Sequence, residues 1–143
     1  MGIFSLFGKS EGTENKREAK LAKQKKNLVK YELMEESDTL VDFFQANYVE
    51  HLLAGFGQWQ QGWAYFTEER LIVITGLLED HIVIPYRNIR SMEKGSQGAF
   101  PIAVSITYEN LKGELATDKI SLMKRDEWME FMAQRADLPL EEI

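Results

Sequence analysis

The chain has 143 residues, carries no cysteine and has a net charge of −6, and 44% of its residues are hydrophobic. This length and composition predict one domain with a single buried core. The absence of cysteine excludes disulfides, thiolate nucleophiles and cysteine-based metal sites, and it fits a reducing compartment. No apolar run approaches the ~20 residues that span a bilayer.

Charge is distributed unevenly along the chain. Residues 1–30 contain eight Lys and Arg against three Glu, a net charge of +5, so residues 31–143 carry −11. An acidic body repels nucleic acid, and we therefore expect no nucleic-acid partner. The sequence predicts a basic, partly helical arm over residues 1–35 and a folded body over residues 36–143.

The arm begins with a short apolar segment, residues 1–9, followed by a hinge at residues 10–14. Residues 15–34 are strong helix formers and predict a helix. Three roles stay open for it: packing loosely on the body, lying on an anionic membrane, or forming a coiled-coil seam with a partner. In the membrane interpretation Phe4 and Phe7 insert, and each cation near the surface contributes ~1 kcal/mol. Those cations are Lys16, Arg17, Lys20, Lys23, Lys25, Lys26 and Lys30.

A second, short helix is predicted over residues 37–47. Ser37 or Asp38 can cap it, and Leu40, Val41 and Phe44 share one helical face. Residues 48–56 are then expected to form the first strand, and residues 58–62 a turn.

Residues 62–89 predict three short strands separated by polar turns, with Pro85 ending the third. Strands this close in sequence must pair as antiparallel hairpins. A further strand is expected over residues 89–93, before the most loop-like stretch, residues 94–101.

Residues 102–108 alternate between apolar and small or polar side chains, as in a half-buried antiparallel strand, and residues 114–122 are its predicted return strand. Residues 124–135 then change to a helical period. Trp128, Phe131 and Met132 fall on one face of this expected C-terminal helix.

Three segments of this pattern resemble a known family. The segments are Gly-Trp-Ala-Tyr-Phe-Thr-Glu-Glu-Arg-Leu-Ile-Val (62–73), Ile-Pro-Tyr-Arg-Asn-Ile (84–89) and Glu-Trp-Met-Glu-Phe (127–131). They are similar to the GRAM and bacterial pleckstrin-homology-like domains, over about residues 48–136.

The resemblance implies an α+β, mainly β fold: an antiparallel meander of about seven strands in two nearly orthogonal sheets, closed by a C-terminal helix. It also implies a binding module without catalytic residues. The lipid-binding members of the family use a basic cup between their first strands, whereas residues 58–61 here carry no charge. The resemblance therefore does not predict headgroup recognition at that position.

An aromatic strand face is the candidate partner surface. Trp63 and Tyr65 lie on one face of their strand, and Ala64 and Phe66 on the other. Residues 38–47 either cover the Trp63 face, or that face is exposed as a patch for a partner. The candidate contacts are Trp59, Trp63 and Tyr65.

Few residues could carry chemistry. Of the two histidines, His81 fits a polar hairpin turn and His51 a strand surface, and neither has a metal-ligand spacing. Residues 95–98 lack the Lys-Ser/Thr ending of a phosphate loop and are expected to be a mobile loop. Arg87 and Arg90 are expected to offset the acidic body and not to bind an anion.

We therefore predict a non-enzymatic interaction module of bacterial origin, without cofactor or metal, whose partner is another protein or a second copy of the chain. The alternative is a peripheral protein that binds anionic membrane through its basic arm. The expected location is the cytoplasm or the inner face of its membrane.

Overall fold

The computed structural model describes residues 8–49, 59–75 and 80–139, with side chains from residue 15 in the first range and from residue 81 in the last. Seven strands of these residues form one antiparallel sheet in the order β4-β3-β2-β1-β7-β6-β5. In chain order the elements are α2 (Gly8–Lys30), β1 (Leu40–Val49), β2 (Gln60–Thr67), β3 (Arg70–Thr75), β4 (Asp80–Pro85), the 3-10 turn η1 (Tyr86–Asn88), β5 (Ile89–Gln97), β6 (Phe100–Glu109), β7 (Leu115–Ser121) and α3 (Arg125–Ala136).

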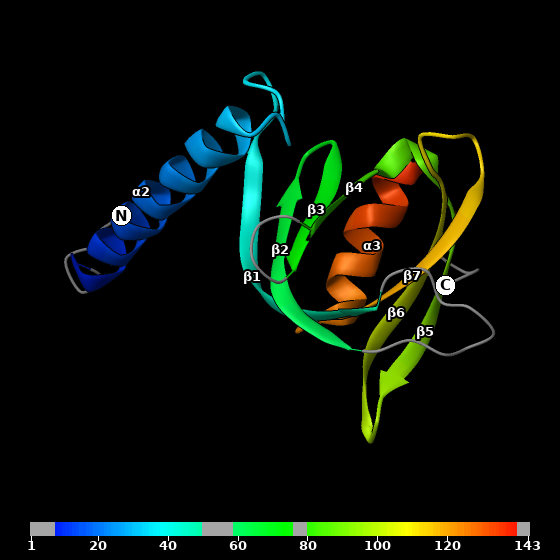
Figure 1. Ribbon diagram of the computed structural model, residues 1–143. Helices are drawn as coiled ribbons and strands as arrows, with labels where there is room; N and C mark the ends of the chain where they lie inside the picture. Colours follow the sequence, from blue (N-terminus) through cyan, green and yellow to red (C-terminus); the bar gives the residue numbers. More distant parts are fainter. Residues whose placement is uncertain (1–7, 50–58, 76–79, 140–143) are drawn as a thin grey trace.

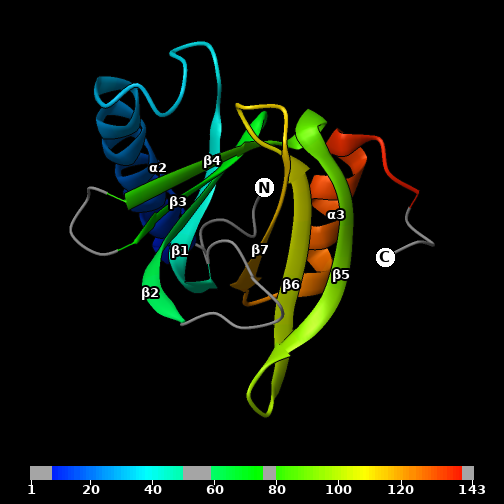
Figure 2. The same ribbon diagram turned by 45° about the vertical axis from the view of Figure 1, so that its right-hand side comes forward.

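The sheet bends so that its two halves enclose α3. Strand β1 pairs with β2 along most of its length, and among the described residues its pairs with β7 are made by Asn47, Tyr48 and Val49. The two expected sheets are thus the halves β4-β3-β2-β1 and β7-β6-β5 of one hydrogen-bonded sheet. Helix α3 lies between the halves, and α2 lies outside them beside β1 (Figure 1, Figure 2). The predicted mainly β fold with a closing helix is confirmed.

Helix α3 closes the core with the face that its sequence predicts. Met129, Met132 and Ala133 are buried. Trp128 stacks on Phe66 of β2 with ring centroids 4.1 Å apart. Ring stacking of this kind adds to the stabilisation from apolar burial. Both the ring contact and the buried apolar area therefore hold the helix to the sheet.

The resembling segments meet at the β2–β3 turn. The Thr67 hydroxyl accepts hydrogen bonds from the backbone N–H groups of Glu69 and Arg70, at 3.1 and 2.9 Å. The Tyr86 hydroxyl donates to the Thr67 carbonyl at 2.7 Å. Arg135 of α3 pairs with Glu68 of the same turn at 2.7 Å. One structural junction therefore joins the three sequence signatures, which are Thr-Glu-Glu-Arg, Pro-Tyr and the C-terminal helix.

Tyr86 makes this junction sensitive to alkali. Burial raises the pKa of Tyr86 well above its ordinary value of 10.0, so its hydroxyl stays protonated and keeps donating. The pKa of Tyr86 is higher in the folded state than in the unfolded state. The protonated hydroxyl therefore stabilises the fold fully below pH 10.0, and this stabilisation is lost as the pH rises through the folded-state pKa. We expect the free energy of unfolding to fall above that pH, by at most about 1.4 kcal/mol per pH unit from this group. Tyr86→Phe should flatten the fall in urea titrations at successive pH values; an unchanged slope would assign it to other groups.

The helix predicted over residues 37–47 is wrong, because these residues enter strand β1 at Leu40. Phe44, Ala46 and Tyr48 point into the core, which is a period of two and not of 3.6. Asp38 does not cap a helix; its Oδ1 accepts from the N–H of Thr39 at 2.7 Å. The predicted first strand, residues 48–56, overlaps only the end of β1, and residues 50–58 lie outside the described residues.

The loop predicted over residues 94–101 is also wrong over most of its length. Strands β5 and β6 continue through it, and Gln97 pairs with Phe100. Gly98 has φ +58°, which a two-residue hairpin turn requires and glycine adopts without strain. Residues 95–98 are therefore the end of a strand and its turn, and neither a mobile loop nor a phosphate loop.

Candidate interaction surface

Helix α2 covers part of the outer face of the sheet. Leu28 of α2, with Leu33 and Met34 just after it, forms a second buried cluster with Tyr65 and Ile72. The cover expected from residues 38–47 is thus provided by the basic arm. Tyr65 is only 8% exposed as a result, and this leaves Trp63, at 41%, as the exposed aromatic of the predicted pair.

Beside this cover lies a groove of about 560 Å³, which we call the aromatic groove. Phe43 stacks on Tyr65 with centroids 5.8 Å apart and lies 6.0 Å from Trp63. The groove is lined by Gln24, Phe43, Gln45, Gln61, Gly62, Trp63, Tyr65 and Ile74.

Gly62 permits the close approach of β2 and β3 at the floor of this groove. A Cβ atom there would stand 2.5 Å from the carbonyl oxygen of Ile74 and 2.8 Å from a methyl group of Thr75. No side chain fits without moving the backbone, so the glycine that precedes the aromatic residues of β2 is a packing requirement.

A second hollow of about 630 Å³ shares Gln45 and Gln61 with the aromatic groove. Trp59, the third predicted contact, lies here with the exposed side chains of Phe100 and Met123. The described structure therefore places Trp63 and Tyr65 in one hollow and Trp59 in the next. Phe43, Phe100 and Met123 escaped the sequence analysis; the alternation of residues 43–48 was the signal that could have identified Phe43.

The described residues that line these two hollows include no charged side chain. In the whole chain 28% of residues are charged, so this depletion distinguishes the surface. Aromatic and Met enrichment together with charge depletion characterises the core of protein–protein interfaces. Most polar side chains of the lining are amides, from Gln24, Gln45, Asn47, Gln61 and Gln97.

The predicted membrane contacts of α2 divide into two groups. Arg17 pairs with Asp42 of β1 at 2.9 Å, and Lys25 is half-buried. Successive residues turn by about 100°, so the exposed lysines fall within an arc of roughly 120° on the side away from Leu21 and Leu28. This lysine face consists of Lys16, Lys20, Lys23, Lys26 and Lys30. Phe4 and Phe7 lie outside the described residues.

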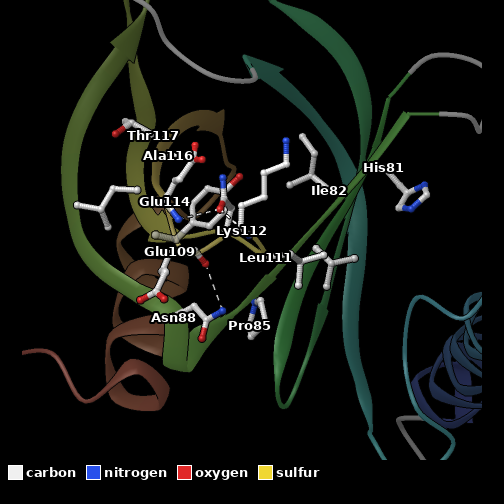
Figure 3. A pocket seen from close by; sticks show the side chains of 14 residues that line it. His81, Ile82, Pro85, Asn88, Glu109, Leu111, Lys112, Glu114, Ala116 and Thr117 are labelled. Atoms are coloured by element: carbon white, nitrogen blue, oxygen red, sulfur yellow. Dashed lines mark hydrogen bonds between the residues drawn. The ribbon is translucent and has the colours of Figure 1, made fainter.

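A third hollow, of about 700 Å³, lies between β4 and the β6–β7 hairpin (Figure 3). Several of its polar groups are already engaged within the protein. Asn88 donates to the carbonyl of Glu109 at 3.2 Å, and the Asn110 side chain accepts from the N–H groups of Lys112 and Glu114. A ligand would have to displace these bonds, so the cavity is a weaker candidate than the aromatic groove.

The remaining candidates are placed as follows. His81 is exposed and belongs to the lining of that cavity (Figure 3), while His51 lies outside the described residues. Arg90 pairs with Glu109 at 2.6 Å, as expected of a counter-charge, and Arg87 is exposed. The described residues contain no cluster of three or more metal-binding side chains. Within the same residues no helix combines the length and apolarity that crossing a membrane requires.

Comparison with known proteins supports the fold. No protein-family model and no curated protein match the chain. Among solved structures, the C-terminal domain of an unknown protein from Leishmania infantum is 20% identical, with a TM-score of 0.51, over 88% of this chain and 96% of that one. The Vps36 N-terminal PH domain is 16% identical (TM-score 0.50; 76% and 83% covered), and the PH domain of human pleckstrin homology domain-containing protein family A member 5 is 13% identical (TM-score 0.50; 74% and 84% covered).

Proposed function

We propose that this pleckstrin-homology-like domain is a non-enzymatic module that binds a protein segment in its aromatic groove. The observation that carries the proposal is the uncharged lining around the exposed ring of Trp63. Trp is among the residues that dominate binding energy in interfaces. Phe43, which is itself stacked on Tyr65, lies beside the Trp63 ring. A prearranged aromatic floor loses little side-chain freedom on binding. The partner presents an apolar side chain to this floor.

The test is selection of random peptides displayed on phage against the wild-type chain. Selected peptides are then measured by fluorescence polarisation against Trp63→Ser. We expect binding to weaken at least tenfold, about 1.4 kcal/mol, because the floor loses its main contact.

Leu111→Ser is the matched control, since Leu111 is fully exposed on the β6–β7 hairpin, outside the groove lining. Selected peptides whose affinity is equal for Trp63→Ser and the wild type would contradict the proposal.

A second candidate function is attachment to an anionic membrane through the lysine face. Its supporting observation is that five exposed lysines of α2 point away from the body. The apolar residue Leu28 of α2 is buried against the sheet, so a docked helix attaches by charge and does not insert. In this function residues 1–35 are the membrane arm and residues 36–143 the body that it carries.

Substitution tests this function better than deletion of the arm, because deletion would uncover Tyr65 and Ile72. Lys16→Gln/Lys20→Gln/Lys23→Gln should weaken co-sedimentation with phosphatidylserine vesicles by about 3 kcal/mol, roughly a hundredfold, and the wild-type binding should weaken with salt. The matched control is Lys94→Gln/Lys112→Gln/Lys124→Gln on the body. If both triple variants lost vesicle binding equally, net charge alone would explain the binding. That result would contradict attachment through the lysine face.

A further inference from the structure

The aromatic groove has a positively charged border on its α2 side. Gln24 forms the α2 wall of the groove. Lys20 and Arg17 precede it by four and seven residues, so they continue the same row along the helix. Lys16 lies one turn before Lys20 and is exposed. A segment that enters the uncharged groove therefore meets lysines next to it, which favours an apolar residue followed by acidic ones.

The chain itself contains such a segment. Residues 139–143 are Pro-Leu-Glu-Glu-Ile, with two acidic residues, two large apolar residues and no basic residue. Just before it, the chain is still attached to the fold, because the N–H of Leu138 donates to the carbonyl of Ala133 at 2.9 Å. The charge of this segment is opposite to that of the border of the groove.

We infer that residues 139–143 of one copy bind the aromatic groove of a second copy, with Leu140 beside Trp63 and with Glu141 and Glu142 along Lys16 and Lys20. This inference rests on the proposed function and names its partner.

The same copy cannot supply the segment. The end of α3 lies across the molecule from α2 (Figure 1, Figure 2), and α2 lies on the outer face of the sheet. Four residues beyond Pro139 span at most about 14 Å when extended. That is only about one radius of gyration of a folded chain of this size, too short to pass around the sheet. Binding is therefore between copies: a reciprocal exchange of the two segments gives a two-fold dimer, and a head-to-tail arrangement gives open chains or closed rings.

Reversing the charges on the segment and on the border of the groove, first separately and then together, tests the inference without lipid present. Sedimentation velocity of the full chain is measured over a wide range of concentration, for the wild type, for Glu141→Lys/Glu142→Lys, for Lys16→Glu/Lys20→Glu and for all four changes together. We expect the wild type to associate and each double variant to associate at least tenfold more weakly, with association restored when the two sets are combined. Adding Trp63→Ser to the combined variant should remove the restored association.

Several outcomes would overturn the inference. These are a wild type that stays monomeric at every concentration, a double variant that associates normally, or a combined variant without recovery. Association that needs residues 1–7 but is indifferent to Glu141 and Glu142 would assign the groove to the N-terminal segment instead. If phage-selected peptides still depend on Trp63 in any of these cases, the proposed function stands and only its assigned partner fails.

Discussion

Replacing Phe66 by alanine is expected to lower the free energy of unfolding by about 3–5 kcal/mol, the usual cost of removing a buried phenyl ring. Phe66 is 0% exposed and packs against both Phe44 of β1 and Trp128 of α3, with centroids 5.7 and 4.1 Å away. Its loss removes the contact that joins the sheet to the closing helix. Urea denaturation followed by far-ultraviolet circular dichroism measures the change.

Phe100→Ala is the matched control, because Phe100 is 66% exposed. We expect this variant to stay within about 0.5 kcal/mol of the wild type, as surface substitutions usually do. Similar losses at positions 66 and 100 would contradict the assignment of the core between β2 and α3.

Arg70→Met is expected to lower the free energy of unfolding by about 3 kcal/mol, because it leaves a buried carboxylate without its counter-charge. The Asp38 side chain is fully buried, and its Oδ2 lies 3.9 Å from Nε of Arg70. Neither of these two atoms makes a hydrogen bond with the described residues, so charge alone relates them. Arg70 also donates to the carbonyl of Leu33 at 3.3 Å, which ties β3 to the connection between α2 and β1.

The Arg90–Glu109 pair is the control, because its charged atoms lie closer together than those of Arg70 and Asp38 but its side chains are more exposed. Its atoms are 2.6 Å apart, and both side chains are exposed. Arg90→Met should change the free energy of unfolding by at most about 1 kcal/mol, because water already solvates both charges. Adding Asp38→Asn to Arg70→Met should recover part of the loss, since no buried charge then remains unpaired. Equal effects of Arg70→Met and Arg90→Met would show that burial is not the deciding factor.

The local hydrophobic pattern was sufficient to predict an element where the segment has a single period and clear boundary residues. The strands of residues 62–85 and the hairpin of residues 102–121 were predicted close to their observed bounds, because Gly76 and Pro85 delimit the first set and residues 102–108 alternate regularly. Helix α3 was predicted to within a residue at each end, because Trp128 and Met132 are one turn apart. The Thr67 turn was recognised as a signature, but its hydrogen bonds became visible only in the fold.

The candidate surface was predicted only in part. Trp59 and Trp63 were identified as aromatic residues near a strand face, but Phe43 fell within the helix predicted over residues 37–47. The groove requires Phe43, Trp63 and Gln24 to meet from β1, β2 and α2. Such a meeting is a long-range contact, which no local periodicity records.

The sequence by itself determined the β meander, the closing helix, the basic arm and the acidic body, because side-chain period and charge are local properties of the chain. Only the tertiary structure decided that residues 40–49 are a strand, because β2 and β7 supply backbone partners on its two sides that outweigh its helical signals. The same is true of α2. Its apolar stripe and its lysines are visible in the sequence, but the docking of Leu28 on the sheet is what turns the lysine face outward and leaves the aromatic groove beside it.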